Sequence, residues 1–104
     1  MPFHPLEKLS RLHDGYQRAF KIEGHALLLC QMEGQVFIIE NNCPHMDAPL
    51  TDATQVSGGK LRCRAHGIEF DLNSGRACGP LADTIAKVSK FSVVYEGGSV
   101  GTEF

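Results

Sequence analysis

The chain has 104 residues, 21% of them charged, and a formal net charge of −2 at pH 7. This length predicts one domain with a hydrophobic core that needs no disulfide staples, and the ordinary apolar content argues against disorder. The absence of a Lys/Arg run excludes a nucleic-acid footprint, and no apolar stretch approaches the roughly 18 residues of a membrane helix. Residues 1–5 lack the layout of a signal peptide, so we expect a cytoplasmic protein without a membrane tether.

The first half of the chain predicts short strands separated by frequent turns. One or two helical turns are expected at 6–12, followed by strands at 18–22, His25–Met32 and Gln35–Glu40. The last two strands meet at Glu33-Gly34, a dipeptide that favours a hairpin turn. Residues 43–54 contain two prolines and two aspartates without periodicity, which predicts a loop.

The second half of the chain also predicts short strands separated by turns and loops. A short strand is expected at Lys60–Arg62, a second loop at 63–67, and a half-buried strand at 68–72, where apolar and acidic residues alternate. We further expect a helical turn at 81–86, an alternating strand at 87–93 and a final strand from Ser99. The pattern as a whole indicates an all-β chain.

Two Cys/His pairs occupy the two predicted loops. Cys43 and His45 form a C-x-H motif in the first, and Cys63 and His66 form a C-x-x-H motif in the second. Two thiolates on one iron and two imidazoles on the other are the ligands of a Rieske [2Fe–2S] centre. The same four residues could also hold zinc, but zinc sites usually pair thiols with thiols and histidines with histidines at longer spacings. A zinc-stabilised interaction module is therefore the alternative of another class.

The other two cysteines lack a neighbouring histidine. Cys30 ends an apolar run and is expected to be a small buried thiol. Cys78 is interpreted as a packing residue near the site, with a ligand role left open. A disulfide between the two is not expected in a reducing compartment.

The two motifs, with Gly67 directly after the second histidine, resemble the Rieske family, and the resemblance spans nearly the whole chain. It implies an antiparallel β-sandwich base with an inserted two-loop cluster-binding subdomain at about 41–81, within one domain at 1–104. It also implies that Cys43 and Cys63 bind the inner iron of the cluster, while His45 and His66 bind the outer iron.

Two departures from the high-potential members of that family indicate a low reduction potential. Ala48 and Ala65 stand where those members carry a disulfide between the loops. Ile68 and Phe70 stand where they carry a serine and a tyrosine, whose hydroxyls donate hydrogen bonds to sulfur and so stabilise the reduced form. We therefore expect a midpoint near the low end of the Rieske span, at roughly −150 mV.

Residues around the motifs have two interpretations each. The apolar loop residues either only shield the cluster or also form a docking rim; these are Met46, Pro49, Leu50, Pro80 and Leu81. The acidic residues either steer a basic partner or are simply solvated; these are Asp47, Asp52, Glu69 and Asp71.

The resemblance implies an electron carrier that catalyses nothing by itself. Its expected partners are a flavin-dependent NAD(P)H reductase and a terminal ring-hydroxylating oxygenase, each bound through a small, transient interface. The small subunit of an assimilatory nitrite reductase shares the fold and size and is the alternative within the same class. Many such subunits lack the Cys and His ligands that this chain carries.

Overall fold

The computed structural model describes residues 2–44, 48–64, 67–79 and 84–104. The 3₁₀ turn η1 spans Leu9–Arg11. The strands are β1 Phe3–Lys8, β2 Gln17–Ile22, β3 His25–Met32, β4 Gln35–Glu40, β5 Thr54–Val56, β6 Lys60–Arg62, β7 Glu69–Asp71, β8 Lys90–Phe91, β9 Val94–Glu96 and β10 Ser99–Glu103. In the part of the chain described here, no helix is long and apolar enough to cross a membrane.

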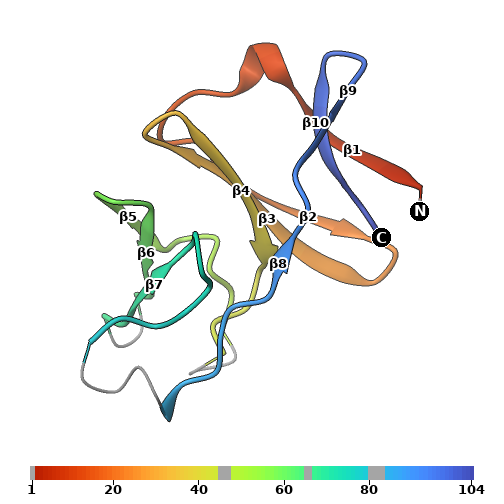
Figure 1. Ribbon diagram of the computed structural model, residues 1–104. Helices are drawn as coiled ribbons and strands as arrows, with labels where there is room; N and C mark the ends of the chain where they lie inside the picture. The colour runs from red at the N-terminus through yellow and green to blue at the C-terminus, as the bar shows by residue number, and fades with distance from the viewer. Residues whose placement is uncertain (1, 45–47, 65–66, 80–83) are drawn as a thin grey trace.

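The strands form three antiparallel sheets (Figure 1). The middle sheet has the order β2-β3-β4-β8, the terminal sheet β1-β10-β9, and the third sheet β5-β6-β7. The third sheet is inserted along the chain between β4 and β8, and it lies at the opposite end of the molecule from the two termini. This arrangement confirms the predicted antiparallel β-sandwich base with an inserted segment.

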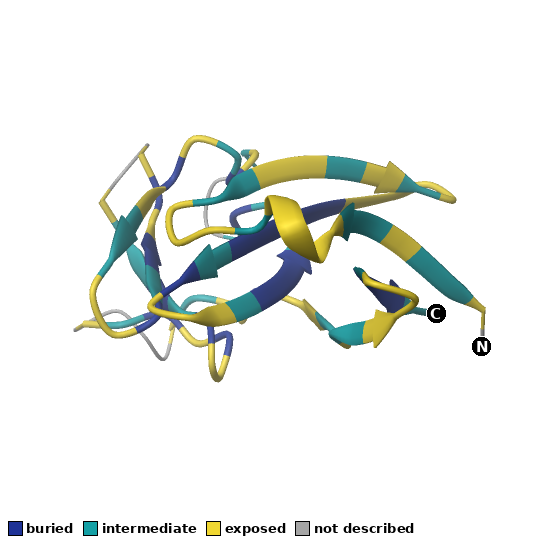
Figure 2. Cartoon of the chain, turned by 90° about the horizontal axis from the view of Figure 1, so that it is seen from above, coloured by how far each residue is buried: buried dark blue, intermediate teal, exposed yellow. Residues whose placement is uncertain are grey.

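The central strands of the middle sheet, β3 and β4, are buried on both faces, and β3 contributes to two separate hydrophobic cores. Leu27 and Leu29 pack with Ile38 and Val100 toward the terminal sheet. Leu28, like the other side chains of the opposite face of β3, packs toward the third sheet. Because adjacent side chains of a strand point to opposite faces, a strand buried on both sides reads as a continuous apolar run. Figure 2 shows the buried positions gathered along these central strands.

The central hairpin agrees with the sequence prediction residue for residue. β3 and β4 have the predicted bounds, and the turn between them places Glu33 at φ 51° and Gly34 at φ 75°. Two consecutive positive φ angles are the signature of the type I′ turn, whose twist matches that of the flanking strands. The predicted strands at 18–22, Lys60–Arg62 and 68–72 also appear, as β2, β6 and β7.

The helical turns expected at 6–12 are only partly correct. Residues 3–8 form β1, and only Leu9–Arg11 makes a 3₁₀ turn. The leucines at 6, 9 and 12 have helical spacing, but β1 pairs with β10 from the far end of the chain. This long-range pairing, with a bulge between Pro5 and Glu7, overrides the local pattern.

The strand expected at 87–93 is only partly correct, because the chain changes sheets there. β8 spans Lys90–Phe91 and pairs with β4, whereas β9 begins at Val94 and pairs with β10. Between them the Ser92 hydroxyl lies 3.3 Å from the Thr102 hydroxyl and accepts a hydrogen bond from the Glu103 N–H. The alternation predicted an extended chain but not the sheet to which each part belongs.

Two further boundaries need correction. The loop expected to run to residue 54 ends one residue earlier, because Thr54 begins β5, a strand that the sequence reading missed. The helical turn expected at 81–86 falls largely outside the described residues. Within its described part, Thr84 has a 3₁₀ conformation, whereas Ile85 and Ala86 are not helical.

Candidate metal centre

The two cysteines of the motifs sit in loops that are closed in the same way. The Cys43 N–H donates a 2.7 Å hydrogen bond to the carbonyl of Ala48, and the Cys63 N–H donates a 2.8 Å bond to the carbonyl of Ile68. In both cases the acceptor lies five residues further along the chain. Each cysteine therefore stands at the base of a short closed loop, where its backbone is fixed.

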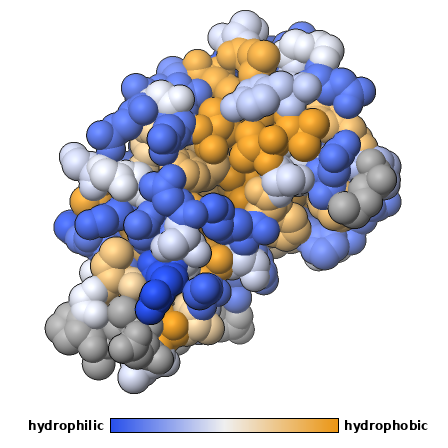
Figure 3. Space-filling view, viewed as in Figure 1, coloured by the Kyte–Doolittle hydropathy of each residue, from blue (hydrophilic) through white to orange (hydrophobic). Residues whose placement is uncertain are grey.

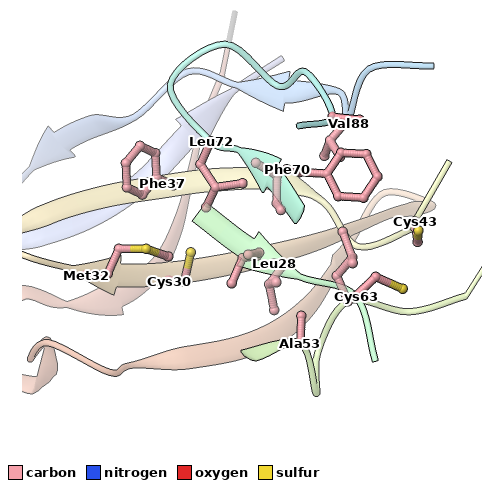
Figure 4. Close-up of a cluster of buried hydrophobic side chains, with 14 residues drawn as sticks. Leu28, Cys30, Met32, Phe37, Cys43, Ala53, Cys63, Phe70, Leu72 and Val88 are labelled. Atoms are coloured by element: carbon pink, nitrogen blue, oxygen red, sulfur yellow. The ribbon is translucent and has the colours of Figure 1, made fainter. Parts of the chain in front are cut away.

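Both thiols also lie at one end of a shared hydrophobic core. Cys43 is fully buried and Cys63 is 3% exposed, and both belong to the cluster between the middle and third sheets. Figure 4 shows them on the same side of this cluster, with Met32 and Phe37 at the opposite side. Two loops far apart in sequence thus bring two thiols to one region.

The chemistry of these donors fits the thiolate half of a [2Fe–2S] cluster. All four cysteines of the chain are described, and no disulfide joins any of them. A thiolate in apolar surroundings is costly unless a cation compensates its charge. Iron bound by Cys43 and Cys63 would supply that compensation, and it would require one thiolate from each loop, as found.

The predicted imidazole ligands, His45 and His66, lie outside the described residues, as does Ala65. Their positions in the sequence place them within the two closed loops, between Cys43 and Ala48 and between Cys63 and Ile68. In the described part of the chain, no group of three or more His, Cys, Asp or Glu side chains is arranged to hold a metal ion. The ligand set of four residues accordingly stays a prediction.

Gly67 adopts a conformation that other residues avoid. Its φ of 68° lies in the left-handed region, and its N–H donates to the carbonyl of Cys63 over 2.9 Å. A residue with a Cβ is strained there. The glycine therefore allows the tight return of the second loop.

Ile68 and Phe70 both pack in the core that contains the two thiols. Phe70 is fully buried, and Ile68 is half-buried against the same cluster. In Figure 4 the Phe70 ring lies toward Cys43 and Cys63. Neither side chain carries a hydrogen-bond donor, so these positions contribute apolar surface where a hydroxyl would contribute a donor.

The remaining cysteines follow the expectations in part. Cys30 is fully buried, and burial raises the pKa of its thiol to about 12. Cys78 is partly exposed, and its N–H donates to the carbonyl of Glu69 in β7. Cys78 thus adjoins the strand that follows the second loop, consistent with a packing residue near the site.

The surface around the loops is mixed. Leu50 is 1% exposed and shields the core, whereas Pro49 is exposed and lines a groove of about 400 Å³ beside Cys63 and Arg64. Met46, Pro80, Leu81 and Asp47 lie outside the described residues. Figure 3 shows hydrophilic residues over much of the third sheet, while apolar ones gather on this face where the other two sheets meet.

The acidic residues do not form a uniform negative ring. The Glu69 carboxylate is engaged by Arg62 at 2.7 Å, and the Asp71 carboxylate accepts a hydrogen bond from the Asn73 N–H. Asp52 is exposed in the groove that also contains Arg64. The contacts of Glu69 and Asp71 with neighbouring groups therefore reduce the negative charge that is left to attract a basic partner.

Sequence reasoning missed a group of side-chain amides beside the first loop. Gln17, Asn41 and Gln55 donate to or accept from the segment at 50–53 or from one another. Glutamine and asparagine carry no distinctive pattern, and these partners are up to 38 residues apart. No local signal could have identified them.

Comparison with known proteins identifies the family. The Rieske [2Fe-2S] domain matches residues 3–90. The ferredoxin component of the alkene monooxygenase system of Xanthobacter autotrophicus is 31% identical over 94 residues, covering 88% of this chain and 75% of that protein. The ferredoxin component of the naphthalene 1,2-dioxygenase system of Pseudomonas aeruginosa is 31% identical over 93 residues, covering 88% of this chain and 86% of that protein.

A solved structure shows the same fold. The ferredoxin of Sphingomonas yanoikuyae B1 superposes with a TM-score of 0.85 at 28% identity, and 99% of each chain is covered. The chain belongs to the Rieske [2Fe–2S] family. Its cofactor is a Rieske [2Fe–2S] cluster, and it is an electron-carrying ferredoxin rather than a catalytic subunit. These matches favour iron over structural zinc, and a ferredoxin over a nitrite reductase subunit.

Proposed function

We propose that this protein carries single electrons from a flavin-dependent NAD(P)H reductase to a terminal ring-hydroxylating oxygenase. The relatives named above are ferredoxin components of oxygenase systems, one acting on alkenes and one on naphthalene. A bound [2Fe–2S] cluster supplies a one-electron couple. The protein's own part is to hold that couple near the surface while excluding water from its inner side.

We assign four residues to the cluster. Cys43 and Cys63 hold one iron through sulfur, and His45 and His66 hold the other through ring nitrogen. The observation that supports this assignment most strongly is the matched closure of the two loops by Cys43 and Cys63, at one end of one hydrophobic core. The spacing of the two histidines within the loops supports the imidazole half.

We further propose that residues 1–104 form one Rieske domain with a cluster-binding subdomain at about 41–81, and that the protein works in the cytoplasm. The insertion of the third sheet between β4 and β8 supports the subdomain. The core shared by the middle and third sheets supports a single domain. Docking to either partner should bury less than ~1,200 Å², as transient electron-transfer contacts do.

The ligand assignment is tested on purified protein. The wild type should contain equimolar iron and acid-labile sulfide, and its reduced form should give an EPR spectrum with an average g below that of plant-type ferredoxins. Cys43→Ser, Cys63→Ser, His45→Ala and His66→Ala should each abolish this spectrum. Cys78→Ser is the matched control and should keep it. Colourless protein that takes up no iron after anaerobic reconstitution would overturn the assignment.

The direction of electron flow is tested by rapid mixing. Protein reduced by a flavin-dependent reductase and NADH should be reoxidised by an oxidised terminal oxygenase of the naphthalene type, and the visible absorbance of the cluster reports both steps. Failure of the reduced protein to transfer electrons to any oxygenase, together with reoxidation by a sirohaem nitrite reductase, would reassign the chain to nitrite reduction.

A further inference from the structure

The segment that follows the first loop is held by one glutamine of the middle sheet. Gln17 lies in β2, and its side-chain Nε2 donates hydrogen bonds to the carbonyls of Thr51 at 2.7 Å and Ala53 at 2.8 Å. A longer contact of 3.4 Å reaches the carbonyl of Leu50. Both hydrogens of the amide can thus be used on one short segment, at 50–53.

A second side-chain amide orients that of Gln17. Gln55, in β5, donates from Nε2 to the Gln17 Oε1 at 3.2 Å and to the Tyr16 carbonyl at 3.1 Å. This contact orients the Gln17 amide so that its nitrogen faces the segment at 50–53. Gln17 therefore has a defined orientation and both of its polar ends are satisfied.

Asn41 holds the same segment from the end of β4. Its Oδ1 accepts a 2.8 Å hydrogen bond from the Leu50 N–H, and its Nδ2 donates to the Thr51 hydroxyl over 2.8 Å. The Asn41 backbone is fixed in turn by its N–H, which donates to the carbonyl of Ala26 in β3 of the middle sheet. The segment thus receives contacts from β2 and from the residue that directly follows β4.

The two loops differ in how they are secured. The second loop lies between the paired strands β6 and β7, so the ladder that joins those strands fixes both of its ends. The first loop lies between β4 and β5, which belong to different sheets and do not pair. Side-chain amides connect the far end of the first loop to the middle sheet. The ends of the second loop are instead connected by the backbone ladder between β6 and β7.

We propose that Gln17, oriented by Gln55 and assisted by Asn41, is a positioning residue that fixes the segment at 50–53 against the middle sheet, and with it Cys43, which is paired with Ala48 at the base of the first loop. This proposal rests on the ligand assignment made under Proposed function. Neutral amides are suited to this role because their hydrogen bonds do not change with pH in the physiological range. Ala48 at the usual position of a loop-bridging cysteine leaves the first loop dependent on such contacts.

The test compares matched substitutions at two glutamines in the cluster-loaded protein. Gln17→Met removes both donors at similar volume, and Gln17→Glu replaces them by oxygens that face the Thr51 and Ala53 carbonyls. Gln35→Met and Gln35→Glu make the same changes on an exposed glutamine of β4 and serve as controls. Gln55→Met should give a weaker effect in the same direction as Gln17→Met.

Three quantities are measured: the rate of iron loss to a chelator, the EPR line widths of the reduced cluster, and the unfolding temperature. Losing two partly buried hydrogen bonds should speed iron loss about tenfold in Gln17→Met, and more in Gln17→Glu. The EPR lines should broaden because the Cys43 ligand samples more positions. The Gln35 variants should match the wild type in iron loss and line width.

A role in folding alone gives a different result. If the Gln17 and Gln55 variants unfold at lower temperature but keep the wild-type line widths and rate of iron loss, the positioning role is wrong while the ligand assignment stands. If the wild type itself holds no cluster, the ligand assignment fails first. Should Gln17→Glu not fold, Gln17→Met and Gln55→Met decide the question.

Discussion

Cys63 and Ile68 stand at the two ends of the second loop, joined by a 2.8 Å hydrogen bond from the Cys63 N–H to the Ile68 carbonyl. The bond fixes the Ile68 backbone beside a candidate iron ligand, while the Ile68 side chain packs half-buried on the core that contains both thiols. Position 68 is therefore well placed to alter the electrostatic environment of sulfur without changing the loop.

Hydroxyls at positions 68 and 70 should raise the midpoint potential. In Ile68→Ser with Phe70→Tyr, each hydroxyl that donates to a sulfur favours the reduced form. A hydrogen bond worth about 1 kcal/mol more in that form raises the midpoint by roughly 40 mV. The wild type should lie near the low end of the Rieske span, roughly −150 mV. Redox titration followed by EPR measures both values.

Phe37→Tyr is the control for this experiment, because Phe37 belongs to the same core but lies at its opposite side (Figure 4). Its midpoint should equal that of the wild type. An unchanged midpoint in the double variant would mean that positions 68 and 70 do not face the cluster, and a clearly positive wild-type midpoint would refute the low-potential prediction.

Cys30 should make stability fall at alkaline pH. Burial raises the pKa of its thiol from 9.0 to about 12, so folding favours the protonated form. The stabilisation is fully present below the unfolded pKa and is lost as the pH rises from about 9 toward about 12. In Cys30→Ala the denaturant midpoint should start lower, because of the cavity, but fall less steeply over this range.

The comparison between variants isolates Cys30 from other groups that titrate in the same range. The pKa of Tyr16 is also raised to about 12, by burial and by its hydrogen bond to Glu7. Cys78→Ala keeps both groups and should retain the wild-type slope. Equal slopes in the wild type and Cys30→Ala would show that Cys30 ionises as readily in the folded chain as in the unfolded one.

Gly101→Ala should destabilise the terminal sheet. A Cβ at position 101 would overlap the backbone carbonyl of His4, on the paired strand β1. The overlap can be relieved only by moving β1 away from β10, at a cost of about 3 kcal/mol. Urea unfolding measures the loss.

Gly98→Ala provides the comparison within the same hairpin. Its φ of 79° is strained for alanine, but a Cβ there meets nothing within 4 Å. The cost should be about 1 kcal/mol, from the backbone alone. Equal losses at the two positions would contradict the close approach of β1 to β10.

The Arg62–Glu69 pair should contribute little to stability. The two side chains are 48% and 27% exposed, so water and salt screen their attraction. A double-mutant cycle with Arg62→Gln and Glu69→Gln should give a coupling of about 0.5 kcal/mol that disappears in high salt. Lys60 and Asp71 also oppose each other on β6 and β7. A double-mutant cycle on these two residues gives a coupling energy with which that of Arg62 and Glu69 is compared. A coupling several times larger would indicate a pair shielded from solvent.

Local signals in the sequence predicted the parts of the fold that neighbours in the chain determine. The β3–β4 hairpin and strand β6 followed from turn residues and apolar runs, while the Cys/His spacing made Cys43 and Cys63 candidate ligands, which stays a prediction. Strand β1 could not be predicted in this way, because its partner β10 lies at the other end of the chain. The change of sheet between β8 and β9 and the contacts of Gln17 likewise depend on which segments meet in space.

Alternate side chains of β3 pack into two different hydrophobic cores, with Leu27 and Leu29 in one and Leu28 and Cys30 in the other. Removing β1, β9 and β10 to make a smaller electron carrier would therefore expose the first pair to water. The truncated protein would then be prone to aggregate through its central strands. The loops that carry the cysteines depend on that same strand, so the termini farthest from the metal centre contribute to its integrity.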